Sequence, residues 1–309
     1  MERFVEKYVN PFTDFGFKKI FGEEVNKDLL MDFLNELLKK EQGRIVELTY
    51  LKSEHLGDSA LDRKAIFDLY CTNESGERFI VELQKTKQKF FKDRAVYYST
   101  FAIREQANRA QWDYRLDPVY TIAILDFVFD EHRKNKKKYR YDVKLMDIEE
   151  NEVFYDKLTF IYLEMPKFDK PIEKLRTRFE KWVYLLKNLT HFDHVPEQLR
   201  ESLFEKLFET AEIAKFSPEQ LTSYEDSLKV YRDIKNSIDT AREEGREEGI
   251  EIGVEKGIEI GLEKGKIEGK AEGEYNKALE IARNLKANGL STALIAQSTG
   301  LSLKEIENL

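Results

Sequence analysis

The sequence is poor in the residues that build disulfide frameworks and zinc sites. It contains one cysteine, Cys71, and four scattered histidines among 309 residues. A single cysteine excludes a disulfide framework and a cysteine-based zinc site, and the histidines form no HExxH or HxxxH pair. No apolar run approaches the ~18 residues of a membrane-spanning helix, and the first ten residues lack an apolar signal region. We therefore expect no membrane segment and a cytoplasmic location.

Charge is abundant and unevenly distributed. The 59 acidic residues exceed the 51 basic ones, which gives a net charge of −8, and charged residues make up 36% of the chain. That fraction is above average and predicts long exposed helices. Between residues 85 and 144, however, 15 Lys and Arg stand against 8 Asp and Glu. Such a basic segment is either a footprint for phosphates or an ordinary solvated surface, and counting alone favours neither.

Apolar spacing divides the chain into an α/β part and a helical part. Helical spacing covers the first 40 residues and residues 89–112. Alternating or continuous apolar runs predict strands at 44–51, 65–72, 78–84, 119–128 and 159–164. From Pro171 onward the spacing is only helical, and helices are expected at 171–190, 196–215 and 217–244. The order predicts an α/β core of about 165 residues with an all-helical C-terminal extension.

The most informative stretch is residues 62–84, DRKAIFDLYCTNESGERFIVELQ. If residues 74–76 form a three-residue hairpin loop that ends in glycine, opposed residues have numbers that sum to about 150. This register predicts an apolar face, on which Phe67 pairs with Leu83, Leu69 with Val81 and Cys71 with Phe79. The other face pairs Asp68 with Glu82, and Gln84 lies two residues further along the same side.

Opposed carboxylates suggest a metal site on the wet face of this hairpin. Their Cβ atoms would be roughly 4.5–5.5 Å apart, and like charges at that spacing destabilise a sheet unless a cation lies between them. Carboxylate oxygens favour Mg²⁺, Mn²⁺ or Ca²⁺, which can polarise a phosphodiester and activate a water. Gln84 can orient that water or donate to the developing phosphate charge. The alternative is an exposed hairpin with ordinary polar residues, which chance spacing often produces.

Residues 10–22, NPFTDFGFKKIFG, and the hairpin together resemble the Rpn family of recombination-promoting nucleases. These are also described as transposases of the PD-(D/E)XK nuclease superfamily. The resemblance covers about residues 8–165 and implies a restriction-endonuclease-like core, in which helices flank a mixed sheet. It implies a metal-dependent DNA endonuclease, with Asp68 and Glu82 as the metal-binding acids. Gln84 stands where most superfamily members have Lys, which weakens the expectation of a strong general base.

The resemblance adds further candidates outside the hairpin. Asp14 matches an acid on the first helix that adds a metal ligand or orients a water, and its alternative role is to cap that helix. The basic residues expected to contact DNA follow the hairpin directly: Lys85, Lys87, Lys89 and Arg94. For the aromatic residues of the next helix we favour a place in the core: Tyr97, Tyr98 and Phe101.

Glycine recurs at every fourth position from 245 to 273, beside an apolar series formed by Ile250, Val254, Ile258 and Leu262. Each glycine costs a helix about 1 kcal/mol relative to alanine. Two interpretations stay open: a helical arm that pairs with a second copy in a homodimer, which we favour, and a flexible Glu-rich linker. The final residues, 276–309, resemble a helix-turn-helix. Because Lys304 is the only cation of its last helix, we favour a packing or dimerisation role there over DNA reading.

These patterns predict four segments: a nuclease core at 1–168, a helical region at 169–240, the glycine-rich arm at 241–275 and a helix-turn-helix-like tail at 276–309. The favoured function is Mg²⁺-dependent hydrolysis of DNA phosphodiester bonds, linked to recombination or transposition. The alternative is a non-catalytic DNA-binding or oligomerisation module with a vestigial site, which the Gln84 departure and the net acidity support.

Overall fold

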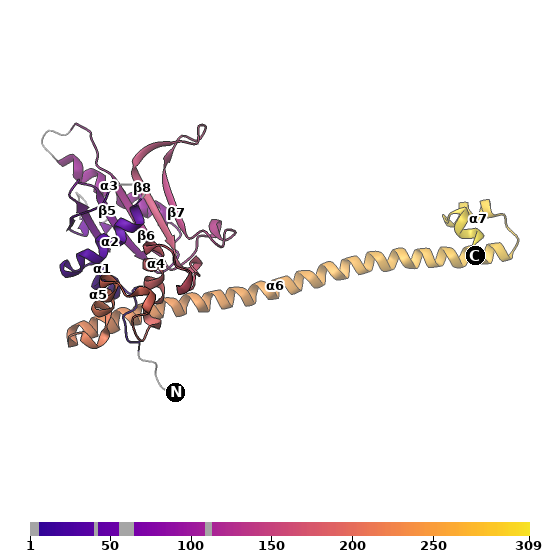
Figure 1. The fold of residues 1–309 in the computed structure, drawn as a ribbon. Coiled ribbons are helices and arrows are strands. Elements are labelled where there is room, and N and C mark those ends of the chain that lie inside the picture. The colour runs from indigo at the N-terminus through magenta and orange to yellow at the C-terminus, as the bar shows by residue number, and fades with distance from the viewer. Residues whose placement is uncertain (1–5, 40–42, 56–64, 109–112) are drawn as a thin grey trace. The chain divides into compact units, whose positions relative to one another are not determined.

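The computed structural model describes residues 6–39, 43–55, 65–108 and 113–309 (Figure 1). The chain forms two compact units, Met1–Lys235 and Asn236–Leu309. The first unit contains a mixed sheet with helices on both faces, and these are followed by helices only. The predicted α/β class with a helical extension is therefore confirmed.

Six strands form the main sheet in the order β1-β4-β5-β6-β8-β7. Their bounds are β1 Leu48–Tyr50, β4 Leu69–Asn73, β5 Arg78–Gln84, β6 Val119–Leu125, β7 Arg140–Met146 and β8 Val153–Glu164. The central strands β5, β6 and β8 run parallel, whereas the outer pairs are antiparallel. Every residue of β6 is buried, as its nearly continuous apolar sequence predicts for a parallel strand covered on both faces. The strands β2 Glu54–His55 and β3 Ala65–Ile66 form a separate pair.

Helices cover the two faces of the sheet unequally. One face packs on α1 Asp14–Phe21, α2 Lys27–Leu38, α4 Arg178–Asn188 and α5 Ser202–Ala211. In that large core Trp182 is fully buried, and its indole N–H donates to Asp32 at 2.7 Å. The other face packs mainly on α3 Phe91–Arg104, through residues such as Phe91 and Phe101. The sheet is therefore buried on both sides.

Most predicted elements are present, with corrections among the strands. Residues 6–39 hold the helices α1 and α2, as the helical spacing predicts, whereas the strand expected at 44–51 is reduced to β1. The strand expected at 65–72 is interrupted at Phe67 and Asp68. The strand β7 was not predicted, because its sequence RYDVKLM lies in the basic stretch and half of it faces solvent at the sheet edge.

The helix expected at 217–244 is much longer, since α6 runs without interruption from Pro218 to Ala287. The glycine-rich segment is thus helical, because Glu, Lys, Leu and Ile between the glycines favour the helix. After Gly289, which has φ +81°, two short helices follow, α7 Thr292–Thr299 and α8 Leu303–Glu307. They pack on the end of α6 through Ala282, Ile295, Leu301 and Ile306.

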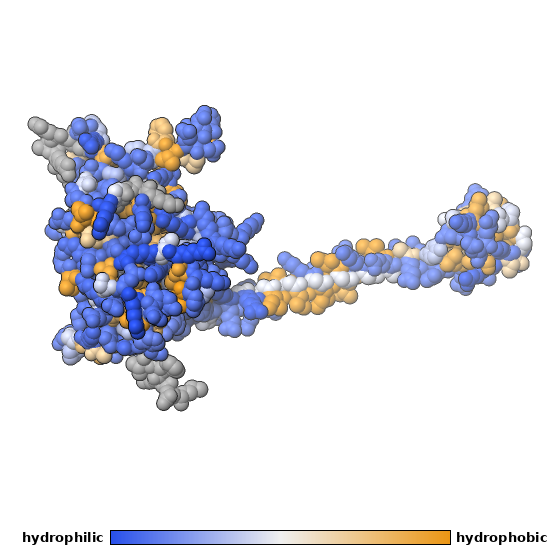
Figure 2. Space-filling model, in the orientation of Figure 1, coloured by the Kyte–Doolittle hydropathy of each residue, from blue (hydrophilic) through white to orange (hydrophobic). Residues whose placement is uncertain are grey.

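Figure 2 shows apolar side chains along the glycine-rich part of α6, beside a pale line of weakly polar residues. The exposed apolar residues include Ile250, Val254, Ile258 and Leu262. A Cβ added to any glycine from Gly245 to Gly273 would meet nothing within 4 Å. Within the described ranges, no helix is both long and apolar enough to cross a membrane.

Candidate active site

The hairpin that joins β4 and β5 has the predicted register. Leu69 pairs with Val81, and Cys71 with Phe79. The turn is held by the Asn73 side chain, whose Oδ1 accepts the backbone N–H groups of Ser75 and Glu77 at 3.1 and 2.9 Å. Gly76 has φ +83°, a left-handed conformation that favours glycine. The turn chemistry thus fixes which residues of the two strands face each other.

The alternation of the first strand breaks just before β4 begins. Register alone puts Phe67 on the face that carries Leu69 and Cys71. Instead Phe67 packs with Tyr70 and Ile80 on the face covered by α3, so that part of the prediction is wrong. The cause is a bend at residues 67 and 68, which ends the regular pleat. Asp68 therefore lies at the end of the β4–β5 ladder, where its side chain no longer follows the strand alternation and lines the cavities on the α1 side.

Two hydrogen bonds to backbone N–H groups hold Asp68 and Glu82 at this break, one from Asp68 itself and one from Leu83. The Asp68 N–H donates to Glu82 Oε1 at 3.3 Å, and Asp68 Oδ2 accepts the N–H of Leu83 at 2.6 Å. The Asp68 carboxylate thus takes the place of a backbone acceptor at the end of the ladder. The two acids are adjacent, but the predicted shared face is wrong. Asp68 lines the cavities on the α1 side, whereas Glu82 points to the α3 side.

The prediction that the polar face of the hairpin is exposed to solvent is wrong, because α3 covers it. Glu82 is only 7% exposed and Gln84 only 8%. Burial, together with the negative charge of Asp68, raises the pKa of Glu82 to about 8, although the nearby Arg94 opposes this. Burial likewise raises the pKa of Asp68, and the Leu83 N–H opposes that shift. Two acids in such surroundings are unfavourable when both are charged, and a cation between them would relieve the repulsion.

Both ends of the Gln84 amide are engaged. Its nitrogen donates to the carbonyl of Thr86 at 2.8 Å, and its oxygen accepts from the guanidinium of Arg94. Arg94 also donates to Gln88 Oε1 at 2.6 Å and lies over the rings of Phe91 and Tyr98. The structure therefore places Gln84 between the acid pair and a cation. It also brings Arg94, a predicted DNA contact, directly to the site.

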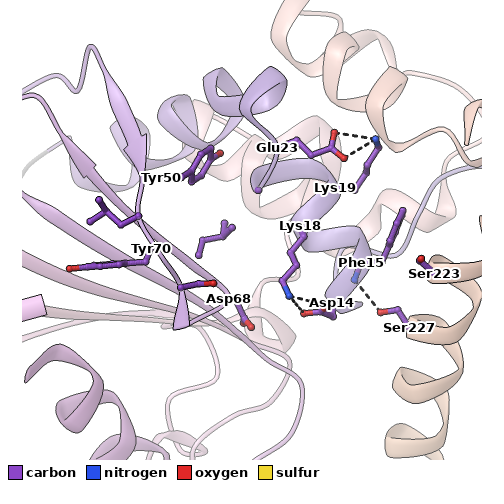
Figure 3. Close-up of a pocket in the computed structure, with 14 residues that line it drawn as sticks. Asp14, Phe15, Lys18, Lys19, Glu23, Tyr50, Asp68, Tyr70, Ser223 and Ser227 are labelled. Atoms are coloured by element: carbon purple, nitrogen blue, oxygen red, sulfur yellow. Dashed lines mark hydrogen bonds and ion pairs between the residues drawn. The ribbon is translucent and has the colours of Figure 1, made fainter. Parts of the chain in front are cut away.

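On the α1 side, Asp68 faces a charged pocket (Figure 3). Asp14 is the first residue of α1, while Thr13 caps the helix by accepting the N–H of Gly16, so the capping role proposed for Asp14 is wrong. The Asp14 carboxylate pairs with Lys18 at 3.0 Å. A cavity of about 430 Å³ opens between α1 and the sheet.

Lys85 approaches the same acids from the end of β5. It lines a smaller cavity of about 100 Å³ with Asp14, Phe17, Asp68 and Leu83. Burial lowers the pKa of Lys85, whereas the carboxylates of Asp14 and Asp68 oppose the shift. Strand alternation explains this position, because Leu83 and Lys85 point to the α1 side and Glu82 and Gln84 point to the α3 side. Lys85, like Lys18, thus lies close enough to Asp68 for its positive charge to act on that carboxylate.

The start of α6 also reaches the charged pocket, which sequence reasoning missed. Ser223 and Ser227 line it, and Ser227 Oγ accepts the N–H of Phe15 at 3.1 Å (Figure 3). Nearby, the Tyr231 hydroxyl donates to Asp126, which follows β6, at 2.9 Å. These contacts join residues more than 100 positions apart, so no local sequence pattern could indicate them.

The other basic candidates differ in their surroundings. Lys87 is ion-paired with Asp130, and Lys89 lies over the ring of Phe90 at 5.4 Å. Among the aromatic residues, Phe101 is buried as predicted and Tyr98 is half-buried. Tyr97 is 42% exposed, so the expectation of a core position is wrong for it. At Tyr97, α3 is therefore exposed where we expected a core residue.

The donor set suits a hard divalent cation. Asp68 and Glu82 supply carboxylate oxygens, and each uses one of them for a backbone N–H. Over the described ranges, no three His, Cys, Asp or Glu side chains are grouped closely enough to hold a metal alone. Water and phosphate oxygens would therefore complete the shell, as is usual for Mg²⁺ at phosphate-binding sites.

Comparison with family profiles decides the relationship. Residues 11–241 match the profile of the PD-(D/E)XK nuclease family transposase. The chain belongs to that family. In addition, residues 276–309 match the C-terminal HTH domain of the Rpn/YhgA-like nuclease family, so the resemblance to Rpn nucleases is confirmed. Comparisons with curated proteins and with solved structures gave no match.

Membership in the PD-(D/E)XK family carries coarse functional meaning. The matched domains are those of a nuclease or transposase, and a nuclease domain with a helix-turn-helix domain is suited to binding DNA. Nucleases of this superfamily generally use divalent metal ions. The matched HTH domain covers the end of α6, α7 and α8, and Ser302 caps α8 through a capping box with Glu305.

Proposed function

We propose that this PD-(D/E)XK family member is a DNA endonuclease that hydrolyses phosphodiester bonds with Mg²⁺, in recombination or transposition in the cytoplasm. The observation that supports this most is the joined pair of Asp68 and Glu82. Glu82 accepts the N–H of Asp68, and Asp68 accepts the N–H of Leu83. With Lys85 and Arg94 beside them, the two acids form a site that is negative at its centre and positive at its edges. Mn²⁺ and Ca²⁺ have the same ligand preference and are expected to bind there too.

The residues would divide the work as follows. Asp68 and Glu82 hold the ion, which when bound polarises the phosphate and lowers the pKa of a water. Lys85, beside Asp68 and Asp14, contacts the scissile phosphate and stabilises its developing charge. Asp14 orients the attacking water or adds an outer ligand. Gln84 is proposed as a positioning residue, because its amide holds Arg94 near Glu82. Lys87 and Lys89 contact the DNA backbone further out.

Plasmid cleavage tests the assignment with isosteric variants. Asp68→Asn and Glu82→Gln remove the charges but keep acceptors for the N–H groups of Leu83 and Asp68. We expect each to lower Mg²⁺-dependent cleavage by at least ~100-fold. Asp142→Asn, on the far edge strand β7, is the matched control and should cleave normally. Equal cleavage by all four proteins would overturn the assignment of the acids.

The alternative is a DNA-binding or oligomerisation module with a vestigial site. It is favoured by Gln84, whose two amide ends are already bonded within the protein. This alternative predicts that the wild-type protein binds DNA but cuts no plasmid with Mg²⁺, Mn²⁺ or Ca²⁺. Binding and cleavage measured on the same preparation separate the two proposals.

We also propose that residues 245–273 pair with a second copy in a homodimer. The glycines leave the backbone of α6 open, and an exposed apolar series runs beside them. A period of four exceeds the 3.6 residues of a helical turn, so the stripe drifts around the helix and a partner would cross it with a right-handed twist. Sedimentation of the full chain tests this, and a monomer at all concentrations would contradict it.

A further inference from the structure

A groove lies on the α3 side of the site, and of its lining residues only Lys89 and Arg94 enter the proposed hydrolysis. Its volume is about 660 Å³, and its lining comes from the start of α3 and the residues before it. The lining residues are Gln88, Lys89, Phe90, Asp93, Arg94, Tyr97 and Tyr98. It is larger than the charged pocket beside α1. The two hollows lie on opposite sides of the sheet. The groove is on the side to which Glu82 points, and the charged pocket is on the side to which Lys85 points.

The groove exposes aromatic surface beside cations. Phe90 is 65% exposed and Tyr97 is 42% exposed, which is unusual for large rings at one place on a surface. Lys89 lies over the Phe90 ring at 5.4 Å, and Arg94 lies over the Tyr98 ring at 5.6 Å. Rings interleaved with Lys and Arg are the elements of a stacking platform for bases, with charge for the adjoining phosphates.

The groove is connected to the candidate active site through two residues. Arg94 lines the groove and donates to Gln84, and its charge acts on Glu82. Tyr98 also lines the groove and lies near enough to Glu82 and Asp68 for both charges to act on its hydroxyl. A ligand in the groove would therefore lie next to the acid pair.

We propose that this groove binds an unpaired DNA base that adjoins the scissile phosphate. A base within a duplex is covered on both faces by its neighbours, so it cannot stack on Tyr97 or Phe90 unless it leaves the helix. Asp93 and Gln88 supply polar groups for the edge of such a base. The proposal rests on the nuclease function and specifies its substrate: DNA with a gap, flap, mismatch or single-stranded end.

Fluorescent probes of paired and unpaired DNA test this directly. The full chain with Asp68→Asn, in Mg²⁺, is titrated with a duplex that carries 2-aminopurine either paired or opposite a one-nucleotide gap. We expect tighter binding of the gapped probe, by roughly 5- to 100-fold, with quenching of its 2-aminopurine by stacking. Tyr97→Ala should reduce this preference at least ~5-fold, while Tyr97→Phe, which keeps the ring, should retain it.

Phe154→Ala is the matched control, because Phe154 is 82% exposed on β8, outside the groove. It should leave the preference unchanged. Equal binding of both probes by the parent protein would overturn the proposal. So would an equal loss for both probes in Tyr97→Ala, which would mean that the groove contacts only the backbone of paired DNA. This assay measures binding, and the plasmid assay measures cleavage. A preference for the gapped probe can therefore be found even if no plasmid is cut, and cleavage can be found without that preference. The two proposals can thus be rejected independently.

Discussion

The two sides of the sheet differ sharply where β5 ends. On the α1 side, Asp14, Lys18, Asp68 and Lys85 form a compact charged pocket. On the α3 side, the neighbouring hollow is larger and built from rings and a guanidinium. A single stretch, residues 82–85, serves both sides, because successive residues of a strand point in opposite directions. We propose that the α1 side is the phosphate side, which contacts the scissile phosphate. The α3 side is the base side, which binds an unpaired base.

Among the residues that flank the acid pair, the largest effect is expected at Lys85, on the phosphate side. Lys85→Ala should lower the kcat/KM of cleavage by roughly 10- to 100-fold, to the same extent for paired and gapped DNA, since both carry the same phosphate. Lys85→Arg should restore part of the activity because it keeps the charge. Lys89→Ala, on the base side, should cost less activity, because Lys89 does not line the cavities beside Asp68. A strong loss for Lys89→Ala with none for Lys85→Ala would reverse the proposed division.

Arg94 lies at the border, so its loss should affect both sides. Its positive charge lowers the pKa of Glu82, and therefore Arg94→Gln should raise that pKa further. Activity should fall about 10-fold at neutral pH, and the pH at which cleavage becomes half-maximal should shift upward. A pH–rate profile measures this, with Arg104→Gln on the same helix as control. A lower rate with an unshifted profile would limit Arg94 to a structural role.

Glu82 should make the metal-free protein less stable as the pH rises. The pKa of a glutamate carboxyl is about 4.3 in an unfolded chain, and burial with the charge of Asp68 raises the pKa of Glu82 to about 8 in the folded protein. Between these values the folded state holds more protons, so the free energy of unfolding falls with increasing pH. In EDTA, Glu82→Gln should exceed the wild type by ~1–2 kcal/mol at pH 9 and by less at pH 5. Denaturant melts measure this, and a constant difference would contradict the burial of a charged Glu82.

The smallest effect is expected in the second unit, in the glycine-rich part of α6. The double variant Gly257→Ala with Gly261→Ala should stabilise a free helix by about 1 kcal/mol for each substitution, and its helicity should rise. In a close-packed homodimer the added methyl groups would instead separate the two backbones. We expect the double variant to sediment more as a monomer than the wild type. If it is more helical and equally dimeric, the glycines are not the contact surface.

Much of the hairpin was predictable because local chemistry determines it. The Asn73 side chain and the left-handed Gly76 specify the turn, and the turn specifies that Leu69 faces Val81 and Cys71 faces Phe79. The adjacency of Asp68 and Glu82 follows from that register. The buried strand β6 was equally clear, since its apolar run has few alternatives in a globular domain.

The surroundings of the acids could not be predicted from the sequence. The solvent exposure of the hairpin's polar face depends on where α3 packs. No local sequence pattern indicates that contact. The bend at Asp68 is a tertiary feature, because the carboxylate replaces a backbone acceptor for Leu83. Likewise, Ser227 reaches α1 across more than 200 positions. The length of α6 was missed because eight glycines lower the expected helicity.

The central claim is that Asp68 and Glu82 together bind a divalent cation. A crystal of the full chain soaked in Mn²⁺, with data collected at the manganese absorption edge, tests it most directly. The account predicts one or two anomalous peaks within about 2.5 Å of oxygens from both carboxylates, and none there in the Glu82→Gln protein. A crystal in which manganese binds elsewhere, with Glu82 still paired only to the Asp68 N–H, would contradict it.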